Sequence, residues 1–168
     1  MSDSSLTPEM ASILTEVRRL AVTASSLESL QKGIAEIISQ RLSYYSWTGF
    51  YMLDANDPGM LLLGPFVGDP TPHVRIPVSE GICGAAVASG ETVVVDDVNA
   101  DPRYLSCSIE TKSEIVVPIY AHDTVVGEID IDSHRIAAFG QVDRSFLEEV
   151  ARVIGSYMER HCGKVLKG

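Results

Sequence analysis

The sequence predicts an α+β domain in which an antiparallel sheet of about six strands carries the N- and C-terminal helices on one face. Helical periodicity is confined to the two ends of the chain, and short β-rich segments punctuated by Gly, Pro, Asn and Asp fill the middle. The 168 residues suit one domain. We expect a lead-in with a helix over 1–25, a single domain over 26–162 and a tail over 163–168.

The first predicted helix covers 9–22, where apolar residues gather on one side. The second covers about 26–42, and Ser25 and Glu28 before its apolar stripe have the spacing of a capping box. The last helix carries a stripe made of Val142, Phe146, Leu147, Val150, Ile154 and Tyr157.

The middle of the chain predicts the strands. The segments are 48–53, 61–67, 74–78, 92–98, 114–120 and 124–132. The last two form a hairpin across His122 and Asp123, and the Ala-rich stretch 81–89 predicts a short helix. The sheet face without the terminal helices is left to meet loops, a partner or a ligand pocket.

The charge balance excludes several classes of function. Lys and Arg number 13 against 23 Asp and Glu, for a formal net charge of -10. Such a chain does not favour phosphate backbones or anionic membranes, so we expect no nucleic-acid and no membrane partner. No apolar run reaches the roughly 20 residues of a membrane span, and no secretory signal is recognisable, which predicts a cytoplasmic protein.

The three cysteines do not predict a disulfide scaffold. Cys83 lies at the start of the short helix, where the helix terminus favours a thiolate, although a small packed residue between glycines is the alternative. Cys107 lies in a polar loop near Arg103 and Lys112, and a reactive thiol and an ordinary loop residue are equally compatible with that setting. Cys162, at the end of the last helix, has no predicted role.

Three carboxylates follow one another on the last predicted strand. Glu128, Asp130 and Asp132 alternate with Ile129 and Ile131, so the acids share one face at about 7 Å spacing. One interpretation is a solvated face, and the other is a cation site. An ammonium is the simpler cation, because no EF-hand loop or histidine pair with metal-ligand spacing is present. No metal site and no cofactor are predicted, since Gly-x-Gly-x-x-Gly and Walker-type loops are also missing from the sequence.

Trp47 and Tyr51 are four residues apart on the first predicted strand, with Gly49 between them. Side chains at that spacing share a face, and the glycine leaves a gap. They are suited to wall a small apolar pocket or cover a cation, and ordinary core packing is the alternative.

Together these segments resemble a GAF domain and, more narrowly, the free methionine-(R)-sulfoxide reductases. The matching stretches are 47–51 (Trp-Thr-Gly-Phe-Tyr), 61–68, 74–78, 81–84 (Gly-Ile-Cys-Gly), 89–92, 97–98, 113–119 and 130–133 (Asp-Ile-Asp-Ser). No single stretch is specific, but their order and spacing are, and the resemblance covers about residues 26–160.

The resemblance implies an enzyme that reduces free methionine-(R)-sulfoxide through thiol chemistry. Cys107 matches the catalytic cysteine, whose thiolate attacks the sulfoxide sulfur and is left as a sulfenic acid. A second thiol then forms a disulfide that a thioredoxin-type reductant reopens. The family also implies a homodimer. The residues that match its substrate site are Glu114, Asp130, Asp132, Trp47 and Tyr51.

The sequence departs from the family at informative positions. His73 stands where the family usually carries a third, resolving cysteine, which leaves Cys83 or an external thiol to resolve the sulfenic acid. Glu128 stands where an apolar residue is more usual, and 108–111 also differ. The alternative functions are a GAF module that binds a small molecule without chemistry and, more weakly, a peroxide-sensing thiol protein.

Overall fold

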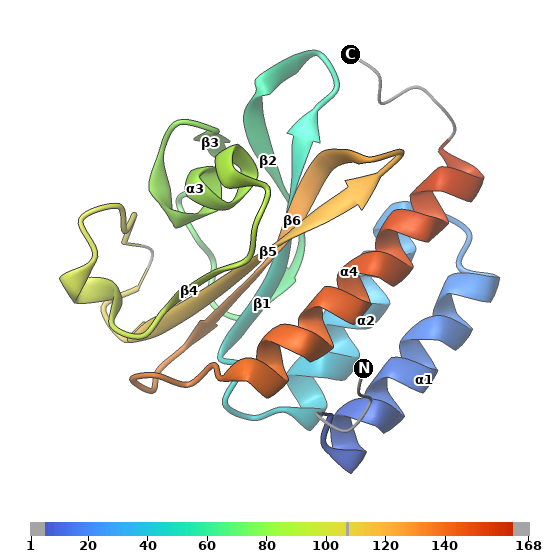
Figure 1. Ribbon diagram of the computed structural model, residues 1–168, viewed down its shortest axis with the longest axis horizontal. Helices are drawn as coiled ribbons and strands as arrows, with labels where there is room; N and C mark the ends of the chain where they lie inside the picture. The colour runs from blue at the N-terminus through green and yellow to red at the C-terminus, as the bar shows by residue number, and fades with distance from the viewer. Residues whose placement is uncertain (1–5, 107, 163–168) are drawn as a thin grey trace.

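The computed structural model describes residues 6–106 and 108–162, and every structural statement concerns these residues. The elements in chain order are α1 (Pro8–Thr23), α2 (Leu27–Arg41), β1 (Trp47–Asp54), β2 (Asp57–Val67), β3 (Arg75–Pro77), α3 (Gly81–Ser89), β4 (Val93–Val95), the short 3-10 helix η2 (Val98–Ala100), β5 (Ser113–Ala121), β6 (Thr124–Ser133) and α4 (Gln141–His161). Figure 1 shows one sheet with α1, α2 and α4 on one side and α3 on the other. This is the α+β architecture that the sequence predicts.

The six strands form one antiparallel sheet in the order β3-β2-β1-β6-β5-β4. The hairpin between β5 and β6 is confirmed, and its turn residues His122 and Asp123 have φ of 52° and 62°. Positive φ at both positions is typical of the hairpin turn that matches strand twist. The hairpin sets the register that places Glu114 opposite Asp132.

The terminal helices bury the main apolar core against the sheet. α2 and α4 contact the strands, and α1 packs on these two helices from outside (Figure 1). The core includes Ile13 of α1, Phe50, Ile129 and Phe146, all without exposed surface. Since α1 contributes buried side chains, it belongs to the same core as α2 and α4.

Gly155 lets α4 lie close to the sheet. A Cβ placed there would lie 2.0 Å from the backbone oxygen of Tyr120 on β5, a separation that no side chain tolerates. The approach brings the apolar stripe of α4 into direct contact with the sheet, as the periodicity of the stripe predicts.

Two local expectations are wrong. The N-cap of α2 is Ser26 rather than Ser25, because the Ser26 hydroxyl accepts the hydrogen bond from the Ser29 amide at 3.0 Å. The edge strands β3 and β4 have three residues each and are shorter than the predicted 74–78 and 92–98. Each edge strand pairs with one neighbour, so fewer backbone hydrogen bonds hold its ends in the sheet.

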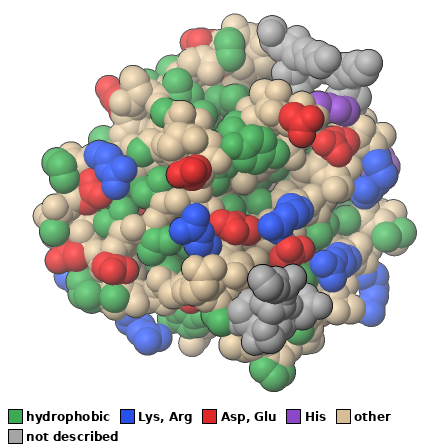
Figure 2. Space-filling model, in the orientation of Figure 1, with side chains coloured by type: hydrophobic (Ala, Val, Ile, Leu, Met, Phe, Trp, Pro, Cys, Tyr) green, Lys and Arg blue, Asp and Glu red, His purple; other side chains and the backbone are tan. Residues whose placement is uncertain are grey.

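The face opposite the terminal helices is covered by α3 and long connections. Trp47, Tyr51, Leu61, Ile76 and Ile82 form part of a second apolar cluster there. Figure 2 shows acidic and basic side chains interspersed over the visible surface instead of gathered into one patch. In the described ranges, no helix combines the length and the apolar character needed to cross a membrane.

Candidate functional site

The alternation of β6 separates its acids from its isoleucines as predicted, but the acids are not solvated. Glu128, Asp130 and Asp132 are 0%, 5% and 3% exposed. Ile129 and Ile131 point into the main core on the other face. The interpretation of this row as a solvated face is therefore wrong, because α3 and the connections around it cover the acids.

The neighbouring strands complete the acidic surface. β5 places Glu114, 6% exposed, opposite Asp132. A carboxyl oxygen of Glu114 lies within 4.8 Å of one of Asp130. Burial raises the pKa of Asp130, although the neighbouring Glu114 and Cys83 side chains act in the opposite direction. A carboxyl with a raised pKa keeps its proton closer to neutral pH and can donate it.

Cys83 joins this cluster from α3. Its Sγ donates to Oδ2 of Asp130 at 3.5 Å, and the side chain is buried. Burial is the main reason that the pKa of the Cys83 thiol lies well above its usual value, and the charges of Asp130, Glu128 and Glu114 raise it further. The expectation that the helix terminus favours a thiolate is wrong, because desolvation and three nearby acids outweigh one short helix.

Glu128 is the most deeply buried acid of the row. Burial raises its pKa well above the usual range, and the charge of Asp130 raises it further, whereas the nearby Cys83 thiol lowers it. Among the residues that the structure describes, neither of its carboxyl oxygens has a hydrogen-bond partner. On the neighbouring strands it faces Tyr51 and Pro118.

An aromatic wall stands beside the acids. Trp47 and Tyr51 stack with ring centroids 6.5 Å apart, and Phe66 stacks on Trp47 at 5.3 Å. A Cβ at Gly49 would lie 2.4 Å from Cη2 of Trp47, so the glycine provides the predicted gap. In the register of β1 and β6, Trp47 lies opposite Asp132.

Hydrogen bonds fix this wall in place. The Trp47 indole Nε1 donates to the backbone oxygen of Asp69 at 2.9 Å, and the Tyr51 hydroxyl donates to that of His73 at 2.8 Å. Both acceptors lie on the connection between β2 and β3. The wall and this connection therefore hold each other in one arrangement.

Two small cavities of about 20 Å³ each lie along the acidic surface. Tyr51, Cys83, Glu114 and Asp130 line the first, together with apolar Ile76, Ile82 and Leu105. Trp47 and Asp132 line the second, with Ser108. Leu105 lies two residues before Cys107 and Ser108 directly after it in the sequence, and Cys107 itself lies outside the described residues. The contributions of Phe66, Ile76, Ile82 and Leu105 were not predicted, since apolar residues on short segments carry no distinctive sequence signal.

His73 connects the site to the loop before Cys107. Its ring Nε2 lies 2.9 Å from the backbone oxygen of Ser106, and its amide donates to the Thr71 hydroxyl at 3.1 Å. The sequence marks His73 only as the position of a missing cysteine. In the structure it lines the same cavity as Cys83 and links two connections by hydrogen bonding.

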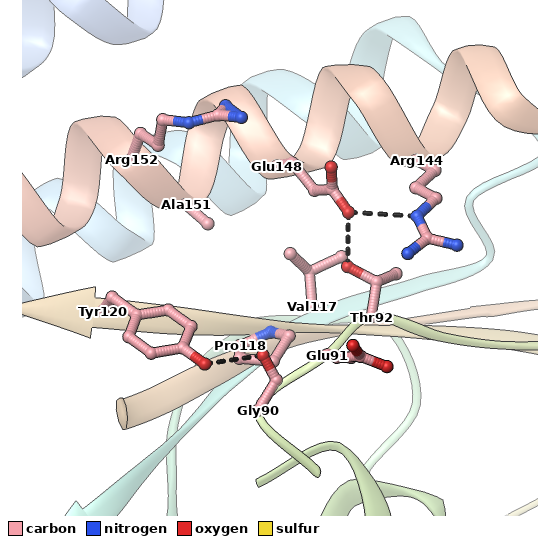
Figure 3. Close-up of a pocket in the computed structure, with 10 residues that line it drawn as sticks. All are labelled: Gly90, Glu91, Thr92, Val117, Pro118, Tyr120, Arg144, Glu148, Ala151 and Arg152. Atoms are coloured by element: carbon pink, nitrogen blue, oxygen red, sulfur yellow. Dashed lines mark hydrogen bonds and ion pairs between the residues drawn. The ribbon is translucent and has the colours of Figure 1, made fainter. Parts of the chain in front are cut away.

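A larger groove of about 370 Å³ lies on the helix face between α4 and β5 (Figure 3). Glu148 accepts hydrogen bonds there from the Thr92 hydroxyl at 2.7 Å and from Nε of Arg144 at 3.1 Å. The Tyr120 hydroxyl donates to the backbone oxygen of Gly90. These polar groups are paired with one another and none of the predicted site residues lines the groove, so the two small cavities are the candidate site.

Comparisons with known proteins identify a family and several relatives of this chain. The GAF domain family profile matches residues 24–159. The free methionine-R-sulfoxide reductase of Saccharomyces cerevisiae is 44% identical over 110 residues, which are 65% of this chain and 61% of the yeast protein. The Escherichia coli protein of the same name is 35% identical over 114 residues, 68% of this chain and 67% of that protein. The chain thus spans less than two thirds of the yeast relative.

A solved structure is similar over nearly the whole chain. It is a free methionine-R-sulfoxide reductase from Neisseria meningitidis in complex with its substrate, and it superimposes with a TM-score of 0.86 at 31% identity. The superposition covers 95% of this chain and 92% of that one.

Proposed function

This chain belongs to the GAF domain family and, within it, to the free methionine-R-sulfoxide reductases, and on that premise we propose that it reduces free methionine-(R)-sulfoxide to methionine. The observation that carries the proposal is a buried acidic surface beside a stacked aromatic wall. Among the described residues that line the two cavities there is no lysine or arginine. A buried surface with several carboxyl groups attracts a cationic group such as an ammonium.

The substrate ammonium binds to Glu114, Asp130 and Asp132, and its methyl group packs against Trp47 and Tyr51. A methionine sulfoxide inside a peptide carries no ammonium, so the site selects the free amino acid. A cavity of about 20 Å³ holds roughly one water molecule. Binding an amino acid therefore requires wall side chains such as Leu105 to shift.

The Cys107 thiolate attacks the sulfoxide sulfur while a carboxyl of the acidic surface protonates the oxygen. The raised pKa of Asp130 suits it to hold that proton. The oxygen passes to the sulfur of Cys107, so the products are methionine and a Cys107 sulfenic acid. The cysteine sulfur loses the two electrons that the substrate sulfur gains.

Cys83 is the proposed resolving thiol. It condenses with the sulfenic acid, which forms the disulfide and releases water, and a thioredoxin-type dithiol then reduces the disulfide. Because its pKa is raised, we expect this step to accelerate as the pH rises above neutral. An external thiol is the alternative route. The homodimer and the cytoplasmic location stay predictions from the sequence.

The test is an epimer-resolved assay. The purified protein is incubated with dithiothreitol and with free methionine sulfoxide that contains both the R and the S epimer at sulfur. The epimers that remain are then separated. We expect loss of the R epimer alone and no reduction of N-acetylmethionine sulfoxide, whose ammonium is blocked. Cys107→Ser should be inactive, and Cys83→Ser should turn over slowly with a dithiol such as thioredoxin.

Three results would count against the proposal. If the R epimer is not consumed, the protein does not have the proposed reductase activity. Substrate binding without turnover would favour the non-catalytic GAF module instead. Full activity of Cys107→Ser would refute the assigned nucleophile. Cys162→Ser is the matched control, since no role is proposed for that half-buried thiol at the end of α4.

A further inference from the structure

The first cavity brings a thiol and two carboxyl groups close enough together to share a ligand other than the substrate. Sγ of Cys83 and carboxylate oxygens of Glu114 and Asp130 all lie within 4.8 Å of one another, and all three residues are buried. They come from α3, β5 and β6, so the tertiary fold and not a local loop assembles them.

The spacing of these atoms is close to that of a metal site. Bonds of about 2.0–2.3 Å in a tetrahedral arrangement place neighbouring donor atoms roughly 3.3–3.8 Å apart. The distance from Cys83 Sγ to Asp130 Oδ2 is 3.5 Å, and the Glu114 oxygen needs to approach these two atoms by about 1.5 Å at most. The cavity of about 20 Å³ has room for one ion and little more.

Glu128 is a second, independent observation that points to a cation. It is not one of the three clustered donors, it has no exposed surface, and its carboxyl oxygens have no hydrogen-bond partner within the described ranges. Its carboxyl nevertheless lies close enough to interact with the Cys83 thiol. A buried carboxyl without a donor is costly, and either a proton or a metal ion compensates for it.

We propose that Cys83, Glu114, Asp130 and Glu128 form a binding site for one thiophilic divalent cation such as Zn²⁺ or Cd²⁺. One sulfur and several oxygens suit such a cation, whereas Ca²⁺ and Mg²⁺ take oxygen ligands alone. Ligation displaces the thiol proton, so affinity falls in acid. Since Glu114 and Asp130 also belong to the proposed substrate site, the cation excludes the substrate. This competition rests on the proposed function, but the binding itself does not.

The test isolates Cys83 as the only thiol. The full-length chain carrying Cys107→Ser and Cys162→Ser is titrated with Cd²⁺ at neutral pH, and the ultraviolet thiolate-to-cadmium charge-transfer band is followed. We expect one cadmium per chain, and no band once Cys83→Ser is added. Adding Glu128→Gln should weaken binding by about tenfold or more. The matched control is Asp132→Asn, a carboxylate on the same strand and face, which should change affinity by less than roughly threefold.

The outcomes separate the two proposals. A missing band, or equal effects of Glu128→Gln and Asp132→Asn, would overturn the metal site. Circular dichroism checks that each variant is folded, and Glu128→Val gives a second test with an apolar residue at that position. In the wild-type protein, Zn²⁺ should inhibit competitively against methionine sulfoxide, and any other pattern would refute the shared ligands. A chain that binds Cd²⁺ but reduces nothing would refute only the reductase.

Discussion

The two faces of the sheet are built from the same strands but bury different chemistry. On the helix face, the side chains that β6 contributes are apolar, including Ile129 and Ile131. On the opposite face, the same strand buries Glu128, Asp130 and Asp132. One face therefore supplies stability and the other supplies reactivity, and strand alternation allows one segment to serve both.

Two buried aspartates make the contrast specific. Asp143 on α4 is 6% exposed and accepts hydrogen bonds from the hydroxyls of Tyr44 and Tyr45 and from the Gly140 amide. Asp130 is 5% exposed and interacts with other acidic groups, Glu114 and Cys83. Its Oδ1 has no partner among the residues described. A carboxylate with neutral donors stabilises the fold, whereas one surrounded by acids is poised for protonation or a cation.

The largest expected effect is on the helix face. Phe146→Ala removes a fully buried ring from the main core and should lower the free energy of unfolding by about 3–5 kcal/mol. Urea denaturation measures the loss. Ile109→Ala is the control, because its side chain is 92% exposed and its loss should change stability by less than about 0.5 kcal/mol. Similar values for the two variants would contradict the described core.

The same substitution at the two aspartates should have opposite consequences. In Asp143→Asn, the new amide group faces the three hydrogen-bond donors of Tyr44, Tyr45 and Gly140 with either its NH₂ group or an oxygen that is a weaker acceptor than a carboxylate. This substitution should lower the free energy of unfolding by about 1–3 kcal/mol and leave the activity per folded molecule unchanged. Asp130→Asn should preserve or raise stability and lower kcat/KM by roughly 10²–10⁴-fold. Thermal unfolding measures the stability of both variants, and the epimer assay measures their kcat/KM. An Asp130→Asn protein that is less stable and fully active would reverse the assignment.

The smallest effect is a pH dependence at Glu128. Its pKa is raised in the folded state, so the stabilisation from its bound proton is complete below the usual glutamate pKa. That stabilisation is lost as the pH rises toward the folded-state value, with a slope of at most about 1.4 kcal/mol per pH unit. Glu128→Gln keeps a neutral side chain at every pH, so its stability advantage over the wild type should grow with pH.

Chemical denaturation at several pH values, with a chelator present, measures this difference. Cys83, Glu114, Asp130 and Tyr51 face the same region. Because Cys83 and Asp130 interact with Glu128, the measured difference includes the change that the substitution makes in their titration. A difference that stays constant with pH would show that Glu128 remains ionised or is solvated.

Much of this arrangement was predictable from periodicity. The helices, the six strands, the hairpin at His122 and Asp123, and the shared face of Trp47 and Tyr51 follow from residue spacing and turn chemistry. The prediction of a single face for the acids of β6 is confirmed for the same reason. Spacing alone, however, left open whether that face was solvated or buried. The position of Cys83 at a helix terminus predicted the wrong direction for the shift of its pKa.

The order of apolar and polar side chains along the chain by itself determined which segments become helices and strands, because hydrogen bonding within a segment or to a neighbouring strand imposes a period of 3.6 or 2. Only the tertiary structure decided that α3 closes over β6 and brings Cys83 to Asp130. Burial and the interactions among buried charges depend on segments far apart in the sequence, and these set the protonation of the acidic face and the chemistry that it can perform.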